Sequence, residues 1–331
     1  MQDIADETGL GKATVSLALR DDPRIRPETR RRVKAVAERL GYVADPTVAS
    51  MMTQLRVTRG PRKNLQPPLA FVHSHPTDAL PISLRRLWAG ANRRAKELGF
   101  ETEIFPLHAP GVSAAQRLQD FESRGIRGIL WGAGCPEDLG SGENAVLWEP
   151  FAHVTMGQRI SLPRLHFAGN DYHGTVFMAM SEMLRLGYQR LGLAISKNTD
   201  RSTDLRFGGG FWAGAKALLA AENCIPPLYV TSPDAFLAWF RTNQPDAIVT
   251  TDENVLQWLT GEPQGTEIGF AHLDWHPGLT NWAGIDQRHE IAGASAVDML
   301  VEQIHHNKRG VPPVQLSTLI SGKWMVGGSR I

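Results

Sequence analysis

This 331-residue sequence has few cysteines, lacks long apolar runs and does not begin with an apolar stretch. The two cysteines, Cys135 and Cys224, lie far apart, which excludes a disulfide framework or a cysteine-based zinc pattern and fits a reducing compartment. The longest apolar run, near 126–133, has the length of a strand and excludes a membrane span. The first residues, MQDIADE, are acidic and lack a secretory apolar stretch, so we expect a cytoplasmic protein.

The composition is that of a folded chain with an uneven distribution of charge. Hydrophobic residues make up 42% of the sequence, enough for packed cores, and the length fits about two domains plus a smaller one. Residues 1–63 contain 13 Lys and Arg against 8 Asp and Glu, a net charge of +5, whereas the remainder carries 22 against 26, or −4. This asymmetry indicates a polyanion-binding module at the amino terminus, or simply a solvated basic face.

The first 45 residues predict three short helices. Their ranges are Gln2–Thr8, Lys12–Leu19 and a stretch that begins at Pro27 and ends before Gly41. Ala5 permits close helix approach, Gly9 permits a sharp turn, and Val15 fills the gap between the first two helices. Two short helices around a glycine turn, braced by a third, are typical of a helix-turn-helix domain; a generic small helical bundle is the alternative.

The same stretch resembles the headpiece of the LacI/GalR family of bacterial transcription regulators. The matching residues stand at the family's spacing: Asp3, Ile4, Ala5, Gly9, Leu10, Thr14, Val15, Ser16, Leu19, Ile25, Thr29, Arg30, Val33, Leu40, Gly41 and Tyr42. The sequence departs from the family pattern at Gly11, Arg26, Ala44 and Asp45. The resemblance implies a sequence-specific DNA-binding regulator, expected to be a repressor under the control of a small-molecule effector.

The resemblance also implies roles in DNA binding for individual residues. The second helix would enter the major groove with Lys12, Ala13 and Leu17 facing base edges. Phosphate contacts, which position the domain without selecting a sequence, are expected from Thr14, Ser16, Arg20, Arg24, Thr29 and Tyr42. For the three hydroxyl residues other than Tyr42, helix capping or surface polarity remains an equal alternative.

Residues 46–66 are predicted to form a hinge helix and a linker. Asp45 is suited to cap a helix and Pro46 to begin it, but the helix is too short to persist alone in water. In the resembled family such a helix forms on DNA beside its dimer mate and inserts an apolar side chain into the minor groove. Met51 or Met52 would take that role here, and the choice between them stays open. A plain linker is the alternative.

Residues 67–331 alternate predicted strands and helices in two blocks. The predicted strands are 69–73, 100–107, 128–131, 152–156, 166–168, 191–195, 228–231, 247–250 and 267–271, and the predicted helices are 84–98, 114–124, 174–186, 210–222, 234–242, 255–260 and 290–306. Such alternation predicts parallel sheets, and two blocks predict two doubly wound lobes with a ligand cleft between them. We place the first lobe at about 67–165 and 288–313 and the second at about 166–287 and 314–331. This part resembles the family's effector domain, which is shaped like periplasmic sugar-binding proteins, through residues 169–174, 184–191, 245–252 and 291–297.

Six residues are predicted to line the effector site: Arg206, Thr251, Asp252, His272, Trp282 and His289. Arg206 matches the family's effector-binding arginine, whose fork suits vicinal hydroxyls or a carboxylate, although a surface arginine is the alternative. Thr251 replaces the usual asparagine, and the family's acid near His272 is missing. Trp282 would stack on a sugar or belong to the core. His73 and His75 form an H-x-H pair without a third ligand, so we expect no metal site.

Three classes of function compete. The first is a homodimeric regulator bound to a palindromic operator, with a sugar or sugar derivative as effector and the helix at about 84–98 in the dimer interface. The second is a small-molecule or sugar-binding protein without a DNA function. The third is a sugar-modifying enzyme on the same scaffold, which the lack of P-loop, G-x-S-x-G and H-E-x-x-H motifs opposes. We therefore expect no catalytic residues and no cofactor.

Overall fold

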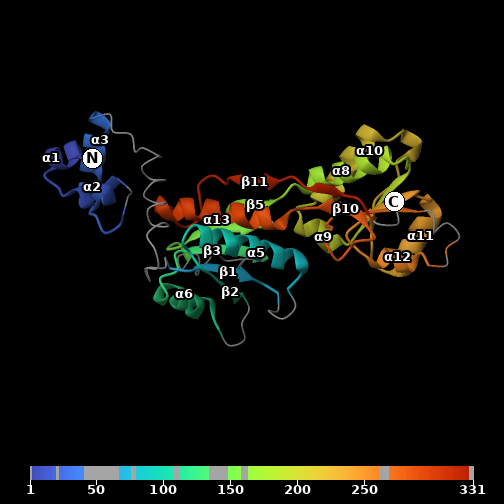
Figure 1. Ribbon diagram of the computed structural model, residues 1–331, viewed down its shortest axis with the longest axis horizontal. Helices are drawn as coiled ribbons and strands as arrows, with labels where there is room; N and C mark the ends of the chain where they lie inside the picture. Colours follow the sequence, from blue (N-terminus) through green and yellow to red (C-terminus); the bar gives the residue numbers. More distant parts are fainter. Residues whose placement is uncertain are drawn as a thin grey trace.

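The computed structural model describes most of the chain. The described ranges are 2–19, 22–40, 67–75, 80–107, 112–133, 148–157, 163–260, 262 and 268–327, without the side chains of residues 2, 13 and 114. None of the helices within these ranges is long and apolar enough to span a membrane. Figure 1 shows a small helical domain at the amino terminus and an elongated body with a sheet in each half.

The amino-terminal domain consists of the three predicted helices. They are α1 (Gln2–Thr8), α2 (Lys12–Leu19) and α3 (Pro27–Arg39). Their shared core contains Ile4, Ala5, Val15, Ala18, Val33 and Ala37, and Val15 is fully buried where the three helices meet. Gly9 has a φ of 64°, the left-handed conformation that the turn between α1 and α2 requires. The i, i+7 spacing from Val33 predicts that Leu40 continues the apolar stripe of α3, but Leu40 is the residue that follows the helix and is 45% exposed.

The first sheet has six strands in the order β11-β5-β4-β3-β1-β2, and all its neighbours are parallel. The strands are β1 (Leu69–His73), β2 (Thr102–Pro106), β3 (Gly128–Ala133), β4 (Ala152–Met156), β5 (His166–Asn170) and β11 (Ser317–Ile320). Helices α5 (Ile82–Glu97) and α13 (His289–His305) pack on one face through a large aliphatic core. Helix α6 (Ala114–Ser123) packs with the aromatic core of the sheet's other side.

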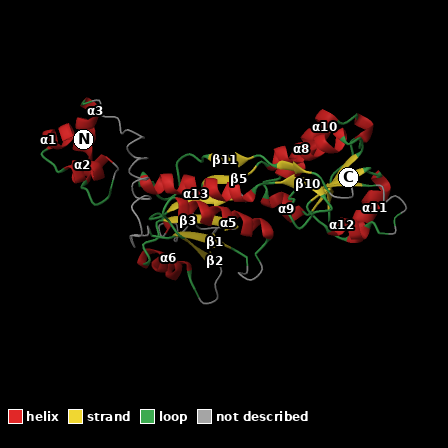
Figure 2. Ribbon diagram, in the orientation of Figure 1, coloured by secondary structure: helices red, strands yellow, loops and turns green. Residues whose placement is uncertain are grey.

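The second sheet also has six strands, in the order β12-β10-β9-β8-β6-β7, and only the pair of β10 and β12 is antiparallel among the described strands. The strands are β6 (Leu191–Ile195), β7 (Leu228–Tyr229), β8 (Ala247–Thr250), β9 (Gly269–His272), β10 (Ala283–Asp286) and β12 (Lys323–Met325). The accompanying helices are α8 (Tyr172–Arg185), α9 (Lys197–Ser202), α10 (Arg206–Leu218), α11 (Pro233–Asn243), α12 (Asn254–Trp258) and a 3₁₀ turn (Ala221–Asn223). Figure 2 shows helices flanking the strands of both halves.

The chain passes between the sheets three times, after β5, after β10 and after β11. The passages lie side by side: the backbone N–H of Asp171 donates to the carbonyl of Ile320 at 3.0 Å, and the Asn170 amide donates to the Gln287 carbonyl. The predicted lobe limits placed β5 and β11 in the second lobe, but both strands pair within the first sheet. Sequence could not reveal this, because sheet membership depends on pairing between segments about 150 residues apart.

The predicted fold class is confirmed: two mostly parallel, helix-covered sheets follow a helical domain. Four elements were missed, namely α9, β10, β11 and β12. Each is six residues or fewer, and the two last strands contain only exposed and half-buried residues, so they carry no strong apolar pattern. The consequence for function is that the carboxyl ends of β5, β9 and β10 lie beside the passages between the sheets.

Candidate functional site

Helix α2 presents the residues predicted to meet bases. Lys12, its first residue, is exposed, and Leu17 is half-buried. Thr14, Ser16 and Thr29 are half-buried as well. Arg20, Tyr42, Met51, Met52 and the side chain of Ala13 lie outside the described residues. The described part therefore offers one exposed cation at the start of the predicted recognition helix.

Arg24, predicted to bind phosphate, is engaged within its own loop. Its Nη2 and Nε atoms donate to the Asp22 carboxylate at 2.7 and 2.9 Å. Its side chain is 75% exposed, so this ion pair is weak and can exchange for a phosphate. A cavity of about 360 Å³ beside this loop is also lined by Arg127 and Arg309 of the body, and it contains none of the predicted effector residues.

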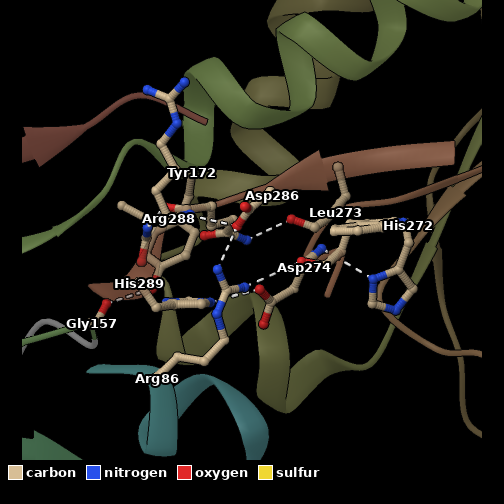
Figure 3. Close-up of polar contacts among 12 residues, drawn as sticks. Arg86, Gly157, Tyr172, His272, Leu273, Asp274, Asp286, Arg288 and His289 are labelled. Atoms are coloured by element: carbon tan, nitrogen blue, oxygen red, sulfur yellow. Dashed lines mark hydrogen bonds and ion pairs between the residues drawn. The ribbon is translucent and has the colours of Figure 1, made fainter. Parts of the chain in front are cut away.

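Arg86 of α5 connects both sheets (Figure 3). Its guanidinium donates to both carboxylate oxygens of Glu290, at 2.7 and 2.8 Å, at the start of α13. It also donates to Asp286 at 2.8 Å, the last residue of β10 in the second sheet. Burial alone would lower the pKa of Arg86, but the hydrogen bonds to these two carboxylates raise it above its ordinary value. Arg86 is therefore permanently charged, and its hydrogen bonds connect the first lobe to the second.

Asp274 contacts both His289 and His272 (Figure 3). The Asp274 carboxylate lies 2.6 Å from Nε2 of His289, and the Asp274 backbone N–H donates to Nδ1 of His272 at 3.2 Å. Burial would raise the pKa of Asp274, but the charge and hydrogen bond of His289 hold it below its ordinary value. Burial lowers the pKa of His272. His272 Nε2 and His289 Nδ1 are buried and have no hydrogen-bond partner within the described chain.

Two buried amides beside the passages are also incompletely paired. Asn170, at the end of β5, donates to the Gln287 carbonyl, and Gln287 donates to the Leu273 carbonyl at 2.6 Å. Both residues are 1% exposed, yet the side-chain oxygen of each lacks a partner among the described groups. Buried polar atoms are normally hydrogen-bonded, so these oxygens and the two imidazole nitrogens are candidates for contact with a bound polar molecule.

Arg206 begins α10, directly after two residues in the left-handed conformation, Asp204 and Leu205. Its Nε atom is buried without a partner in the described structure, and its closest carboxylate is that of Asp204, 3.9 Å from Nη2. No hydrogen bond or ion pair of the described residues connects Arg206 with the Asp274 cluster. Arg206 is therefore a cation without a close counter-ion, as an anchor for an incoming group would be.

Of the remaining predicted residues, Asp252 and Trp282 have local partners. The carboxylate of Asp252 accepts hydrogen bonds from Asn254 at 3.0 and 2.7 Å and thus fixes the start of α12. Trp282 is 8% exposed and packs edge-on against Phe270 and His272, in keeping with the core alternative. Thr251 is half-buried directly after β8. Their contact with an effector stays a prediction.

Sequence reasoning missed Arg86, Asn170, Asp274 and Gln287. The signal that could have found Asp274 is an acid two residues after the end of strand β9. The acid of the resembled family's pattern would stand at position 271, where this chain has an alanine. No local pattern indicates Arg86, because its partners are about 200 residues away in sequence. Among the described residues no group of three or more His, Cys, Asp and Glu could hold a metal ion.

Comparison with protein families gives a match at the amino terminus. Residues 1–45 match the model of bacterial regulatory proteins, lacI family. No curated protein sequence matches the chain.

Solved structures similar to this one include several regulators. The transcriptional regulator CelR in complex with cellobiose is 18% identical, with 98% of each chain covered and a TM-score of 0.55. The Lac repressor dimer bound to operator and the anti-inducer ONPF is 15% identical, with 98% of this chain and 96% of that chain covered and a TM-score of 0.55. A transcription regulator-like protein from Staphylococcus haemolyticus is 13% identical, covering 80% of this chain and 99% of its own, with a TM-score of 0.60. At these identities the likeness shows a shared fold.

Proposed function

Because residues 1–45 form a lacI-family domain and the body has the fold of lacI-family regulators, we propose that the chain is a sequence-specific DNA-binding transcription regulator. It acts as a repressor that a sugar or sugar derivative controls from a site between the two sheets. The observation that carries the proposal is the family match over the domain whose three helices share the predicted core. We propose no catalytic activity and a cytoplasmic location, where the protein meets its operator.

DNA recognition in this proposal depends on helix α2. Its exposed first residue, Lys12, can donate to guanine O6 and N7 in the major groove, and Leu17 can contact thymine methyl groups. A single headpiece offers few base contacts, so the protein binds a near-palindrome as a homodimer. Helix α5 contributes the dimer contact, since Arg85, Ala89 and Arg93 leave one side of it exposed.

Effector control depends on the strand ends between the sheets. Four buried side-chain atoms without a partner in the described chain can hydrogen-bond a ligand there: two imidazole nitrogens, of His272 and His289, and two amide oxygens, of Asn170 and Gln287. The oxygens accept, and each nitrogen donates or accepts according to its tautomer. Arg206 adds a guanidinium fork that matches two hydroxyls or a carboxylate. The hinge at residues 46–66 connects the lobes to the DNA-binding domain, with Met51 or Met52 inserted into the minor groove. A change in the lobe arrangement alters DNA binding through this segment.

The proposal is tested by operator binding of Lys12→Ala. We expect selection from random DNA to return a near-palindrome, which wild-type protein binds with steep salt dependence. Lys12→Ala should lower specific affinity by about tenfold or more, in keeping with the roughly 1–3 kcal/mol of a base contact. Lys216→Ala, which removes an exposed lysine of α10, should bind like wild type. Failure to select any preferred sequence, or a monomer bound to asymmetric DNA, contradicts the proposal.

A further inference from the structure

The turn between α9 and α10 holds an unfavourable backbone. Asp204 and Leu205 have φ values of 60° and 57°, which non-glycine residues rarely adopt consecutively. Leu205 also leaves an apolar side chain 57% exposed. Neither feature stabilises the fold by itself, and such strain persists only where the surroundings impose it.

Asp200 of α9 imposes this conformation. Its side chain is fully buried: one carboxylate oxygen accepts from the Gly208 backbone N–H at 2.9 Å, and the other accepts from the Tyr229 hydroxyl at 2.7 Å. Its backbone carbonyl accepts from the Leu205 N–H at 2.8 Å and from the Thr203 hydroxyl at 2.9 Å. One residue thus fixes both ends of the turn, and Tyr229 connects it to strand β7 of the sheet.

Gly208 shows how closely this carboxylate approaches the helix. A Cβ atom at that position would lie 2.6 Å from Oδ2 of Asp200, so a side chain cannot be added without displacing the carboxylate. Asp200 therefore lies against the first turn of α10, whose first residue is Arg206.

Arg206 directly follows the turn, as the first residue of α10. Its Nε is buried and unpaired within the described structure, and its guanidinium lies 3.9 Å from a carboxylate whose side chain is 62% exposed. The turn thus sets the backbone position from which the Arg206 side chain extends, and the hydrogen-bonding capacity of its Nε is unused in the described structure. A fixed arginine fork loses little entropy when it binds a planar or vicinal pair of oxygens.

We infer that Asp200 and Tyr229 are positioning residues for effector binding, which act by holding the 203–205 turn so that Arg206 points at its ligand. The inference rests on the proposed function, because it takes Arg206 as the effector anchor. It adds that effector affinity depends on a buried carboxylate and a hydroxyl that themselves touch no ligand.

The chain offers variants that separate positioning from bulk stability. Tyr229→Phe removes one hydroxyl from a residue that is 41% exposed, so it creates no cavity in the apolar core. Asp200→Ala removes both side-chain hydrogen bonds. Asp200→Asn can restore both, since its amide oxygen accepts from Gly208 and its NH₂ donates to the Tyr229 oxygen. Tyr188→Phe, in the same lobe, is the matched control.

The first experiment needs no ligand. In full-length protein labelled with ¹⁵N-arginine, the Arg206 Nε–H signal, assigned by its loss in Arg206→Lys, should show an ordered side chain in wild type, Tyr188→Phe and Asp200→Asn. Tyr229→Phe should lower its order parameter, and Asp200→Ala should lower it further. An unchanged Arg206 signal in Asp200→Ala overturns the inference, whatever ligands do.

The second experiment uses cellobiose as the probe in a titration calorimeter. Tyr229→Phe should weaken binding by about tenfold, as loss of a hydrogen bond to a charged group does, and Asp200→Asn by much less. At cellobiose concentrations high enough to measure the residual binding of Arg206→Ala, Tyr229→Phe should have no further effect in that background, because it acts through the arginine. Additive losses overturn the inference. Absence of cellobiose binding to wild type counts against this sugar as effector, and the arginine signal alone then decides on positioning.

Discussion

Arg86 and Arg206 stand on the two halves of the body with opposite surroundings. Arg86 makes paired hydrogen bonds to two carboxylates and has a side chain that is 15% exposed (Figure 3). Arg206 is 32% exposed, has one carboxylate at 3.9 Å and keeps an unpaired Nε. The difference separates two uses of charge. A buried cation whose partners are all present is costly to remove, because its carboxylates then lose their counter-ion, whereas a cation with an unpaired donor can bind a ligand.

Removal of Arg86 should have the largest effect. Arg86→Ala leaves Glu290 and Asp286 without their counter-ion, so we expect the free energy of unfolding to fall by about 3 kcal/mol, as for broken buried pairs. Urea denaturation measures this. Arg94→Ala is the matched control on the same helix, because its partners Glu97 and Asp298 are both 51% exposed and such pairs contribute less than about 1 kcal/mol. Equal losses in the two variants would contradict the assignment.

His153 extends the comparison to a partnered neutral group. Burial lowers the pKa of His153 to about 4, and Trp131 donates to its Nδ1 while its Nε2 donates to the Trp148 carbonyl. The unfolded chain takes up a proton below about pH 6.5 and the folded chain does not. The contribution of the neutral, buried His153 to the free energy of unfolding is therefore fully present above about pH 6.5 and is lost as the pH falls towards 4.

The expected loss from this one group is roughly 2 kcal/mol between pH 7 and pH 4.5. His153→Gln should remove that part of the pH dependence, as seen in urea titrations at the two pH values. His306→Gln, which changes a residue whose side chain is 60% exposed, should leave the pH dependence as in wild type. A His153→Gln protein that loses as much stability as wild type on acidification would show that the burial of this histidine is not what couples stability to pH.

Removal of Arg206 should have the smallest effect on stability. Arg206→Ala breaks no short ion pair, so we expect a change within about 0.5 kcal/mol. It should nevertheless strongly reduce the melting shift that wild type shows with its effector, while specific operator binding remains, because the two sites are separate. A thermal melt with sugars, sugar acids and sugar phosphates measures the first effect, and anisotropy of labelled operator measures the second. A preserved melting shift would remove Arg206 from the effector site.

The sequence predicted those elements of the fold that have strong local patterns. Strands β1, β4 and β6 were predicted residue for residue, because each is a fully buried apolar run bounded by polar or turn residues. Strand β11 was missed because its residues alternate between exposed and half-buried, and its place beside β5 depends on a distant pairing. Helix α9 is too short for a periodic pattern.

The candidate site could be predicted where a single residue carries the chemistry. Arg206 and His289 could be proposed because the resemblance gives their positions, and their contact with an effector stays a prediction. Asp274 and Arg86 were not, because their importance comes from partners that the fold brings within 3 Å: His289 in one case, Asp286 and Glu290 in the other. Asp200 was missed for a related reason, since a buried acid in a polar helix looks like a surface residue until Tyr229 and Gly208 are seen to bind it.

The three passages between the sheets determine what kind of signal the body can produce. Two bodies joined by one tether can twist, slide and bend independently. Three short tethers that are hydrogen-bonded side by side suppress twist and slide and leave one bending angle. If the proposed effector site is occupied, we expect its ligand to act on that bending angle, so different ligands should favour larger or smaller angles between the lobes.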